Sequence, residues 1–411
     1  MKNPAIALEN RYCAHNYSPL PVVLSHGRGV WLVDEVGKHY LDMMSAYSAV
    51  SFGHSNPTLV AALTRQANRL AVTSRAFFTD QLGPFLQLLC EMTGQAKALP
   101  MNSGAEAVET ALKAARKWGH KVKGIPENSA EIIVCNGNFG GRTTTIIGFS
   151  SEAQYRDGFG PFAPGFVSVP FGDTAALEAA ITPRTAAFLV EPIQGEGGIV
   201  VPPDGYLAAC REICTRHNVL LICDEVQTGL GRTGKLLACD HENVKPDGLI
   251  LGKALGGGLL PVSAFLASDE VMAVFTPGDH GSTFGGNPLA AAVGHAALLL
   301  LRDDHLSEAA ERMGHRLQRG LRAINHPAIR VVRGKGLLIG VELDPAIISA
   351  RAFCEILLEL GMLSKDTHET VVRFAPPLTI SASEIDIGLG IIHRAFDAVP
   401  LPAVPVERSF A

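Results

Sequence analysis

Lys253 is the residue of this chain whose type and setting most plainly allow chemistry. It follows an apolar run at 249–251 and precedes a glycine cluster at 256–258. The run predicts a buried strand, and the glycines predict backbone that a ligand can approach closely. Because a desolvated lysine loses its charge readily and its neutral amine condenses with carbonyls, Lys253 is a candidate Schiff-base residue. Taken alone, a lysine in such a position is more often a solvated turn residue.

Asp224 offers a carboxylate at the end of a second predicted strand. Five apolar residues, 219–223, run directly into Asp224 and Glu225. This pattern predicts a strand buried on both faces, and ligands bind at the carboxyl edge of open α/β sheets. A carboxylate there can keep a pyridinium nitrogen protonated, which makes pyridoxal phosphate an electron sink. The plainer alternative is an acidic helix start after a strand.

A third pattern predicts a site for a phosphate group. Asn102, Ser103 and Gly104 precede a strong helical pattern from Ala105 to Lys117. The free backbone N–H groups and the macrodipole at such a helix start attract anions. Any well-capped helix shares this pattern, so it indicates a phosphate site only in combination with Lys253 and Asp224.

The three features occur in an order that resembles the class III, fold type I pyridoxal-phosphate aminotransferases. The similarity extends from about Tyr12 to about Pro377 and includes segments 191–198, 246–247 and 280–288. Within that class, segments 14–22, 45–50, 73–77, 158–162 and 372–377 are most similar to the ornithine δ-aminotransferases.

The resemblance implies roles around the cofactor, pyridoxal 5′-phosphate. Lys253 is implied to bind it covalently and to shuttle a proton, and Asp224 to pair with the pyridinium nitrogen. Val226 and Phe139 are implied to pack on the two ring faces, with Gln227 bonded to the phenolic oxygen. The implied phosphate contacts are Ser103, Gly104, Ala105, Ser282 and Thr283. Because the other subunit supplies Thr283 in this family, the resemblance also implies at least a homodimer.

The resemblance further implies a set of substrate groups. One pocket must bind a carboxylate beside the reacting carbon of 2-oxoglutarate, yet must not leave an unpaired cation there when L-ornithine is bound. Arg373 paired with Glu196 meets both needs if the pair opens and closes. Arg142 is implied to bind the distal carboxylate, Tyr17 to orient the α-amino-acid end of ornithine, and Tyr47 to line the pocket.

The implied reaction is transfer of the δ-amino group of L-ornithine to 2-oxoglutarate, which gives glutamate 5-semialdehyde and glutamate. One alternative is a relative that acts on acetylornithine or 4-aminobutyrate, against which the segment around Tyr17 argues. Another is a non-catalytic protein that binds the cofactor, against which Lys253 and Asp224 argue. Gly141 departs from the pattern, since ornithine enzymes often carry tryptophan there, and this affects local packing more than chemistry.

Composition limits the class of protein. The 411 residues are 47% hydrophobic, and the net charge of −5 offers no footprint for nucleic acid or an anionic membrane. The longest apolar stretch, 289–301, is interrupted by Gly294 and His295 and is shorter than the roughly 18 residues that span a bilayer. The N-terminus resembles neither a signal nor a transit peptide. We therefore expect a cytoplasmic enzyme.

The eight cysteines contain no CxxC pair, which fits reduced thiols. Cys210, Cys214 and His217 could share one helix face, as metal ligands do. No fourth ligand lies nearby in the sequence, so core packing is the favoured interpretation and no metal site is predicted.

Alternating patterns predict the elements that position these residues. The combination of strands and helices predicts an α/β domain with a mostly parallel sheet at about 51–300. A smaller α+β domain at 301–411 follows it, and the resemblance adds the N-terminal segment 1–50 to this smaller domain. The expected strands are 132–135, 187–190, 220–223, 248–251, 329–332 and 337–343, the last two flanking 333–336, and the expected helices are 105–117, 207–217, 289–301 and 306–324.

Overall fold

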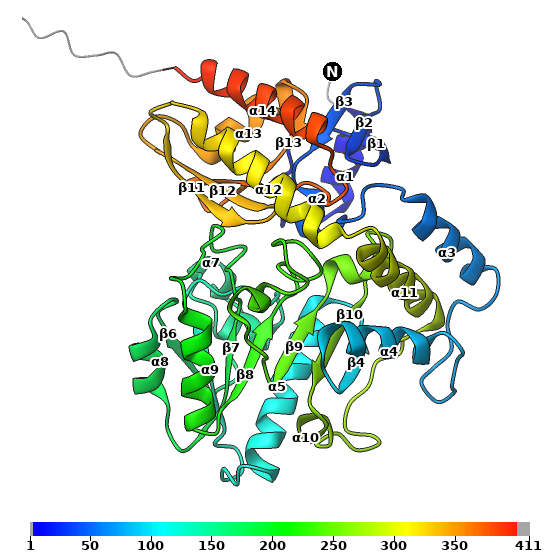
Figure 1. Cartoon of the computed structure of the whole chain (residues 1–411), viewed down its shortest axis with the longest axis vertical. Helices are drawn as coiled ribbons and strands as arrows, with labels where there is room; N and C mark the ends of the chain where they lie inside the picture. The colour runs from blue at the N-terminus through cyan, green and yellow to red at the C-terminus, as the bar shows by residue number, and fades with distance from the viewer. Residues whose placement is uncertain (1–2, 401–411) are drawn as a thin grey trace, which may run out of the picture.

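A seven-stranded sheet forms the centre of the larger part of the molecule in this computed structural model, which describes residues 3–400 (Figure 1). Its strand order is β4-β10-β9-β8-β7-β5-β6, and every neighbouring pair is parallel except those of β10. The strands are β4 (Lys97–Met101), β5 (Glu131–Cys135), β6 (Phe166–Val169), β7 (Thr185–Val190), β8 (Leu220–Asp224), β9 (Gly248–Leu251) and β10 (Ser263–Ala267). The expected α/β class with a mostly parallel sheet is confirmed.

Helices cover both faces of this sheet, which explains why its central strands are continuous apolar runs. Alternate residues face opposite ways: Ile222 and Ile250 belong to the core under α5 (Gly104–Lys121), whereas Leu221 and Leu249 belong to the core on the other face. That other core includes α9 (Tyr206–Arg216), whose Cys210 and Cys214 are fully buried, while His217 caps the helix. These two cysteines pack in the core, as the favoured interpretation held.

The smaller part of the molecule contains two four-stranded sheets. One is antiparallel, in the order β11-β12-β15-β14, and is covered by α12 (Leu306–Ala323) and α13 (Ala350–Glu359), against which α14 (Ala382–Asp397) packs. Its strands are β11 (Ile329–Lys335), β12 (Leu338–Leu343), β14 (Lys365–Thr367) and β15 (Val371–Phe374). Strand β11 runs on through Arg333, Gly334 and Lys335, three positions that the sequence pattern places in a connection, because the chain turns only at Gly336, with a φ of 52°.

The second small sheet joins the two ends of the chain. Its strands are β1 (Leu24–Arg28), β2 (Trp31–Asp34), β3 (His39–Asp42) and β13 (Met362–Leu363), and β13 pairs in parallel with β3. The N-terminal strands therefore lie beside the C-terminal helices, as Figure 1 shows.

The remaining elements of the described residues are further helices and two 3₁₀ turns. They are α1 (Pro4–Tyr12), α2 (Ser45–Ser48), α3 (Pro57–Ala67), α4 (Leu82–Thr93), α6 (Thr144–Gly148), α7 (Ala153–Arg156), α8 (Thr174–Ala180), α10 (Asp269–Met272), α11 (Pro288–Asp303) and the 3₁₀ turns η1 (Ala238–Glu242) and η2 (Lys253–Gly256). Among the described helices, none combines the length and the apolar character needed to cross a bilayer.

Candidate active site

Three neighbouring parallel strands release ionisable side chains at one edge of the central sheet. Strand β7 ends one residue before Glu191, β8 ends at Asp224, and β9 ends two residues before Lys253. Because β7, β8 and β9 pair in parallel, their carboxyl ends lie together. The chain turns sharply here, and Lys253 itself has a φ of 45°.

The setting of Lys253 and Asp224 moves both pKa values toward neutrality. Burial lowers the pKa of the Lys253 ammonium to about 8, although the Glu196 carboxylate opposes this shift. Burial raises the pKa of Asp224 to about 6, while the hydrogen bond from the Val226 amide and the charge of Lys253 act against it. A lysine that gives up its proton near neutral pH suits condensation with a carbonyl.

Glu191 is a member of this group that we had not assigned. Its Oε1 accepts a hydrogen bond from the Phe139 amide at 2.9 Å, and its Oε2 accepts one from the Gly195 amide at 3.1 Å. Burial and the charge of Asp224 raise its pKa to about 8. The signal was present in the sequence, since an apolar run leads straight into Glu191 just as one leads into Asp224.

The start of α5 forms an anion cradle. Its cap, Ser103, and Glu106 form a capping box, in which Glu106 Oε2 accepts from the amides of Asn102 and Ser103. Among the hydrogen bonds of the described residues, none uses the amides of Gly104 and Ala105. Two free amides at the positive end of an 18-residue helix can bind a phosphate group.

Between the cradle and Asp224 the residues fit a flat aromatic ring. Phe139 and Asp224 line one small cavity, and the Val226 side chain lies so close to Gly104 and Gly252 that an added Cβ would be 3.0 and 3.2 Å from its Cγ1. Only Oδ1 of Asp224 has a hydrogen-bond donor among the described residues, the Val226 amide at 3.0 Å. An amide cradle, apolar walls, a carboxylate and an amine together match the chemistry of pyridoxal phosphate.

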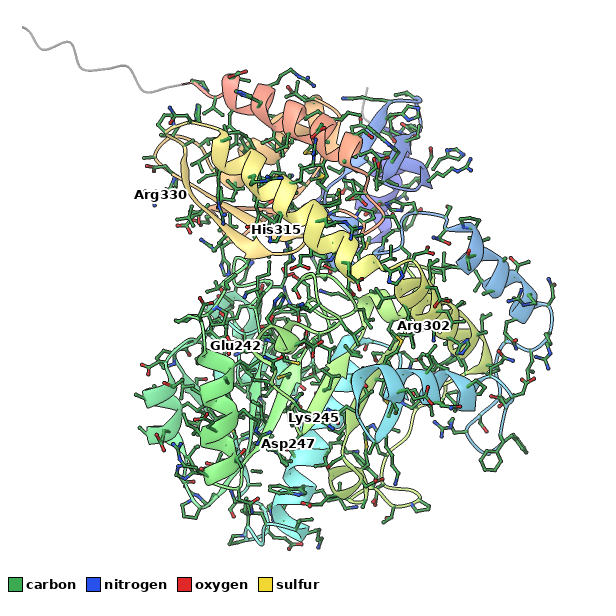
Figure 2. The ribbon with its side chains drawn as sticks, viewed as in Figure 1. Glu242, Lys245, Asp247, Arg302, His315 and Arg330 are labelled. Carbon is green, nitrogen blue, oxygen red and sulfur yellow. The ribbon has the colours of Figure 1, made fainter. Side chains whose placement is uncertain are left out.

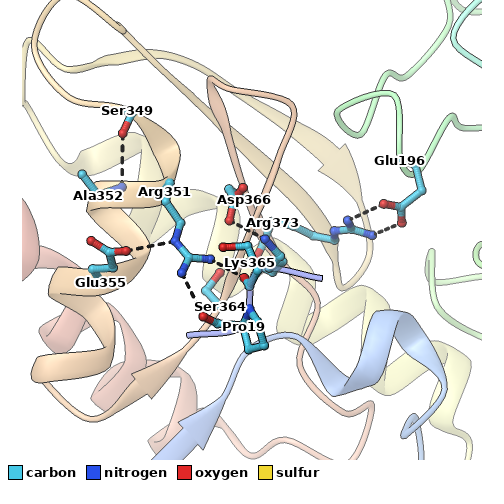
Figure 3. A network of polar contacts seen from close by, with 11 residues as sticks. Pro19, Glu196, Ser349, Arg351, Ala352, Glu355, Ser364, Lys365, Asp366 and Arg373 are labelled. Atoms are coloured by element: carbon cyan, nitrogen blue, oxygen red, sulfur yellow. Dashed lines mark hydrogen bonds and ion pairs between the residues drawn. The ribbon is translucent and has the colours of Figure 1, made fainter. Parts of the chain in front are cut away.

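Arg373 and Glu196 form a bidentate ion pair (Figure 3), and the charges of both act on Lys253. The Nη1–Oε1 and Nη2–Oε2 distances are 2.7 and 3.1 Å, and Arg373 is 1% exposed. Burial disfavours the charged form of Glu196, but Arg373 outweighs this and lowers its pKa to about 2. Arg373 comes from β15 and Glu196 from the loop after β7, so the pair links the two parts of the molecule.

Gln227 bridges this ion pair. Its Oε1 accepts from Arg373 Nη1 at 3.1 Å, and its Nε2 donates to Glu196 Oε1 at 3.1 Å. Both ends of the amide are therefore engaged by the pair in this structure. A Cβ added at Gly195 would be 2.2 Å from Gln227 Oε1, so a larger residue there would displace the Gln227 amide from this bridge.

The predicted substrate residues gather at the mouth of the site. The ring of Tyr47 lies 5.1 Å from the Arg373 guanidinium carbon, and Tyr17 in the N-terminal segment is 76% exposed. Arg142 is exposed and lies over the Tyr155 ring at 3.5 Å. Tyr155, from α7, is a second residue that sequence reasoning missed, because a four-residue helix carries no periodic signal.

The 282–283 segment lies partly outside the site of its own chain. Ser282 Oγ accepts hydrogen bonds from Asn102 Nδ2 and the Gly285 amide, both at 3.0 Å, which ties this loop to the cradle of α5. Thr283 is exposed. Gly141 has a φ of 127° and lies against Ala105, where an added Cβ would be 2.7 Å from the Ala105 Cβ. A larger side chain at position 141 would therefore require the cradle to move.

Residues 3–400 contain no group of three or more His, Cys, Asp or Glu side chains that could hold a metal ion. A larger cavity lined by Arg211, Lys245 and Asp247 lies at the opposite, amino edge of the sheet and contains none of the predicted site residues. Figure 2 labels Lys245 and Asp247.

Comparisons with known proteins point to one family. The aminotransferase class-III family pattern matches residues 12–396. The chain is 56% identical over 391 residues to ornithine aminotransferase 2 of Staphylococcus aureus (strain Mu50 / ATCC 700699), covering 95% of this chain and 98% of that protein. Among solved structures, the ornithine aminotransferase of Toxoplasma gondii, described with partial occupancy of PLP at the active site, has a TM-score of 0.95 and 48% identity, over 96% of this chain and 94% of that one. The acetylornithine aminotransferase of Elizabethkingia anophelis has a TM-score of 0.87 and 49% identity, over 95% and 98%.

Proposed function

This chain belongs to the class-III aminotransferases, which depend on pyridoxal phosphate, and we propose that it transfers the δ-amino group of L-ornithine to 2-oxoglutarate. The products are glutamate 5-semialdehyde and glutamate. The observation that carries this proposal is the closed Arg373–Glu196 pair beside Lys253, because a site for two substrates of different charge needs a cation that can be masked.

The residues that would hold the cofactor follow from the site. The amides of Gly104 and Ala105, with the hydroxyl of Ser103, would bind its phosphate, and Asp224 would pair with its ring nitrogen. Phe139 and Val226 would cover its faces. The bound cofactor supplies an electron sink. We assign the phenolic oxygen to Gln227, which must then share its amide with the Arg373–Glu196 pair.

Lys253 Nζ would move the proton. An amine with a pKa near 8 can take a proton from the substrate carbon and return it at neutral pH, which is what general acid–base catalysis requires. No hydrogen bond of a described residue holds Nζ in place, so the amine is free to reach its acceptor.

Arg373 and Glu196 would select which substrate end lies next to Lys253. While ornithine is bound, the pair stays closed and presents no net charge to the reacting δ-carbon. When 2-oxoglutarate or glutamate is bound, the carboxylate beside the reacting carbon displaces Glu196 and takes both Nη atoms. Arg142, stacked on Tyr155, would bind the distal carboxylate, and Tyr17 would orient the α-amino-acid end of ornithine.

We further propose a homodimer in the cytoplasm. Phe77, Phe78 and Phe284 are 70%, 107% and 54% exposed, and Arg75 lies against Gly286, which brings the loops that carry them together. Such a patch favours a protein interface, and a partner there could receive Thr283 at its own phosphate site. The six buried cysteines all have free thiols, and five of them lie in or beside the large sheet. Free thiols suit a reducing compartment.

A substrate panel tests the proposed activity. Purified protein with pyridoxal phosphate and 2-oxoglutarate should form semialdehyde from ornithine with a higher kcat/KM than from N-acetylornithine or 4-aminobutyrate. Preference for N-acetylornithine would favour the second candidate, which the similarity to the Elizabethkingia enzyme keeps in view.

Tyr17→Phe gives the sharper test of the substrate. Loss of one hydrogen bond to the α-amino-acid end should cost about 1–3 kcal/mol, or roughly five- to a hundred-fold in ornithine kcat/KM. Use of 4-aminobutyrate, which lacks that end, should change much less. If both amines lose the same factor, Tyr17 only supports the fold of its segment.

A further inference from the structure

Four consecutive residues in the wall of the site adopt the left-handed backbone conformation. Their φ angles are 43° at Ser45, 46° at Ala46, 60° at Tyr47 and 74° at Ser48. At Ala46 and Tyr47 the ψ angles of 52° and 40° complete a left-handed helical turn. None of the four is a glycine, and side chains of L-residues crowd the backbone in this conformation. A strained turn of this kind persists only where its surroundings hold it.

Asp42 holds the first end of this turn. Its Oδ1 accepts hydrogen bonds from the amides of Met44 and Ser45, both at 2.8 Å, and its Oδ2 lies 2.7 Å from His54 Nε2. Asp42 is 2% exposed, so its carboxylate and these contacts are buried.

Arg232 is bonded to both ends of this turn. Its Nη2 donates to Ser45 Oγ at 3.3 Å and to Ser51 Oγ at 3.0 Å. Each hydroxyl passes the interaction on, because Ser45 Oγ donates to the Ala375 carbonyl at 2.6 Å and Ser51 Oγ to the Ser48 carbonyl at 3.0 Å. The guanidinium therefore connects the start and the finish of the left-handed turn.

The environment of Arg232 indicates a role beyond core packing. It is fully buried, and the four hydrogen bonds of its side chain all go to uncharged oxygens, including the carbonyls of Leu337 and Pro376. Burial lowers its pKa to about 9, with the charge of Asp42 opposing this. A buried cation without a paired carboxylate is costly, and in some proteins such a group specifies a conformation.

We propose that Arg232 is a positioning residue for the substrate site: it clamps the left-handed turn 45–48 so that the Tyr47 ring lies against Arg373 and limits the space beside the reacting carbon. The turn places that ring 5.1 Å from the guanidinium carbon of Arg373. Since Tyr47 is the only aromatic residue of the turn, a relaxed, right-handed turn would remove its ring from this position. The inference deepens the proposed function, on which it rests for the identity of the substrate.

A double-mutant cycle tests the clamp. Ser51→Ala removes one relay, Arg232→Lys replaces the fork with a single ammonium, and each should lower ornithine kcat/KM by about tenfold, chiefly through KM. In a Tyr47→Ala background the same changes should have almost no further effect, because the ring they position is gone. Equal losses in both backgrounds would overturn the proposal. If the wild type prefers another amine of the panel, the cycle is run with that amine and measures the same coupling.

A second measurement does not depend on turnover. Ala46→Gly should raise the midpoint of thermal unfolding of the cofactor-free protein by about 1–3 °C, because glycine adopts positive φ without strain. Ala61→Gly is the matched control: Ala61 is also exposed but lies in the right-handed helix α3, so the same change should lower the midpoint. A fall for Ala46→Gly as large as that of the control would show that the turn stores no strain.

Discussion

At the scale of single residues, two buried carboxyl groups, those of Asp224 and Glu191, lie close to the proposed position of the cofactor's ring nitrogen. Burial raises the pKa of Asp224 to about 6 and that of Glu191 to about 8, so at neutral pH Asp224 is mostly ionised whereas Glu191 holds its proton. A protonated ring nitrogen nearby would supply a positive charge that favours the ionised form of both groups. Glu191 has a second task, because its two oxygens join the backbone of Phe139 to the loop that carries Glu196.

Glu191→Gln should loosen the cofactor. A glutamine amide can accept from only one of the two backbone N–H groups, and losing a bond to a charged acceptor costs about 1.5–3 kcal/mol. The rate of cofactor release, followed by absorbance, should rise by about ten- to a hundred-fold. Glu242→Gln is the control, since Glu242 also accepts from two amides, Gly205 and Ala208, at 3.2 and 2.8 Å but lies away from the site (Figure 2). Equal release rates in the two variants would contradict this role.

Glu191 also predicts a pH dependence for the cofactor-free protein. Its pKa is raised from 4.5 to about 8, so the folded state binds this proton more tightly than the unfolded state does. Stability from this group is therefore present at low pH and is lost as the pH rises from 4.5 through 8. Urea midpoints at pH 5, 7 and 9 should fall for the wild type relative to Glu191→Gln, which cannot titrate. Parallel curves would show that Glu191 is ionised throughout.

Glu196→Gln should unmask Arg373. The neutral amide cannot balance the guanidinium, so the variant should favour an amine with a carboxylate beside its reacting carbon. In single turnovers, the ratio of the glutamate rate to the ornithine rate should rise by about tenfold or more. An unchanged ratio would mean that this ion pair does not select between the substrates.

At the scale of elements, the N-terminal segment depends on α13. Arg351, near the start of that helix, donates to the carbonyls of Ser18 and Pro19 at 2.9 and 3.1 Å, and its Nε bonds Glu355 (Figure 3). These carbonyls directly follow Tyr17, whose side chain is exposed and has no packing of its own to fix it. A helix of the smaller part of the molecule thus anchors a residue proposed to bind substrate.

Arg351→Gln should therefore raise the KM for ornithine about three- to tenfold while changing kcat little, because the loss falls on orienting the substrate. Arg330→Gln is the control: Arg330 also pairs with a carboxylate, Asp344, but lies on the outer side of the smaller part of the molecule (Figure 2). Steady-state kinetics with ornithine decide the question. A similar KM for the two variants would show that the anchor does not reach the substrate.

At the scale of the whole molecule, the exposed phenylalanines predict an assembled enzyme. The double variant Phe77→Ser, Phe78→Ser should shift the protein toward monomer in sedimentation experiments, since it removes apolar area that association would bury. Cofactor affinity should fall with it if Thr283 serves the partner's phosphate. Val36→Ser, at an 83% exposed position on the β2–β3 turn, should change neither property. A variant that remains dimeric and fully loaded would place the interface elsewhere.

Sequence by itself determined the frame of this site. Apolar runs ending in Asp224 and just before Lys253, and the cap at Ser103, are local patterns, and parallel strands bring their carboxyl ends together whatever the rest of the chain does. The family resemblance then supplied Arg373 and Glu196. Local patterns of this kind record burial and capping, so they predict where side chains emerge.

Only the tertiary structure decided how those side chains meet. Arg373 and Glu196 are 177 positions apart, and their contact depends on how β15 of the small antiparallel sheet lies against the loop after β7. The left-handed turn at 45–48 contains no glycine, so the local sequence does not predict it. The turn is bonded instead to the buried Arg232, 187 positions from Ser45. Contacts between distant segments depend on the packing of the whole chain, which no short stretch of sequence records.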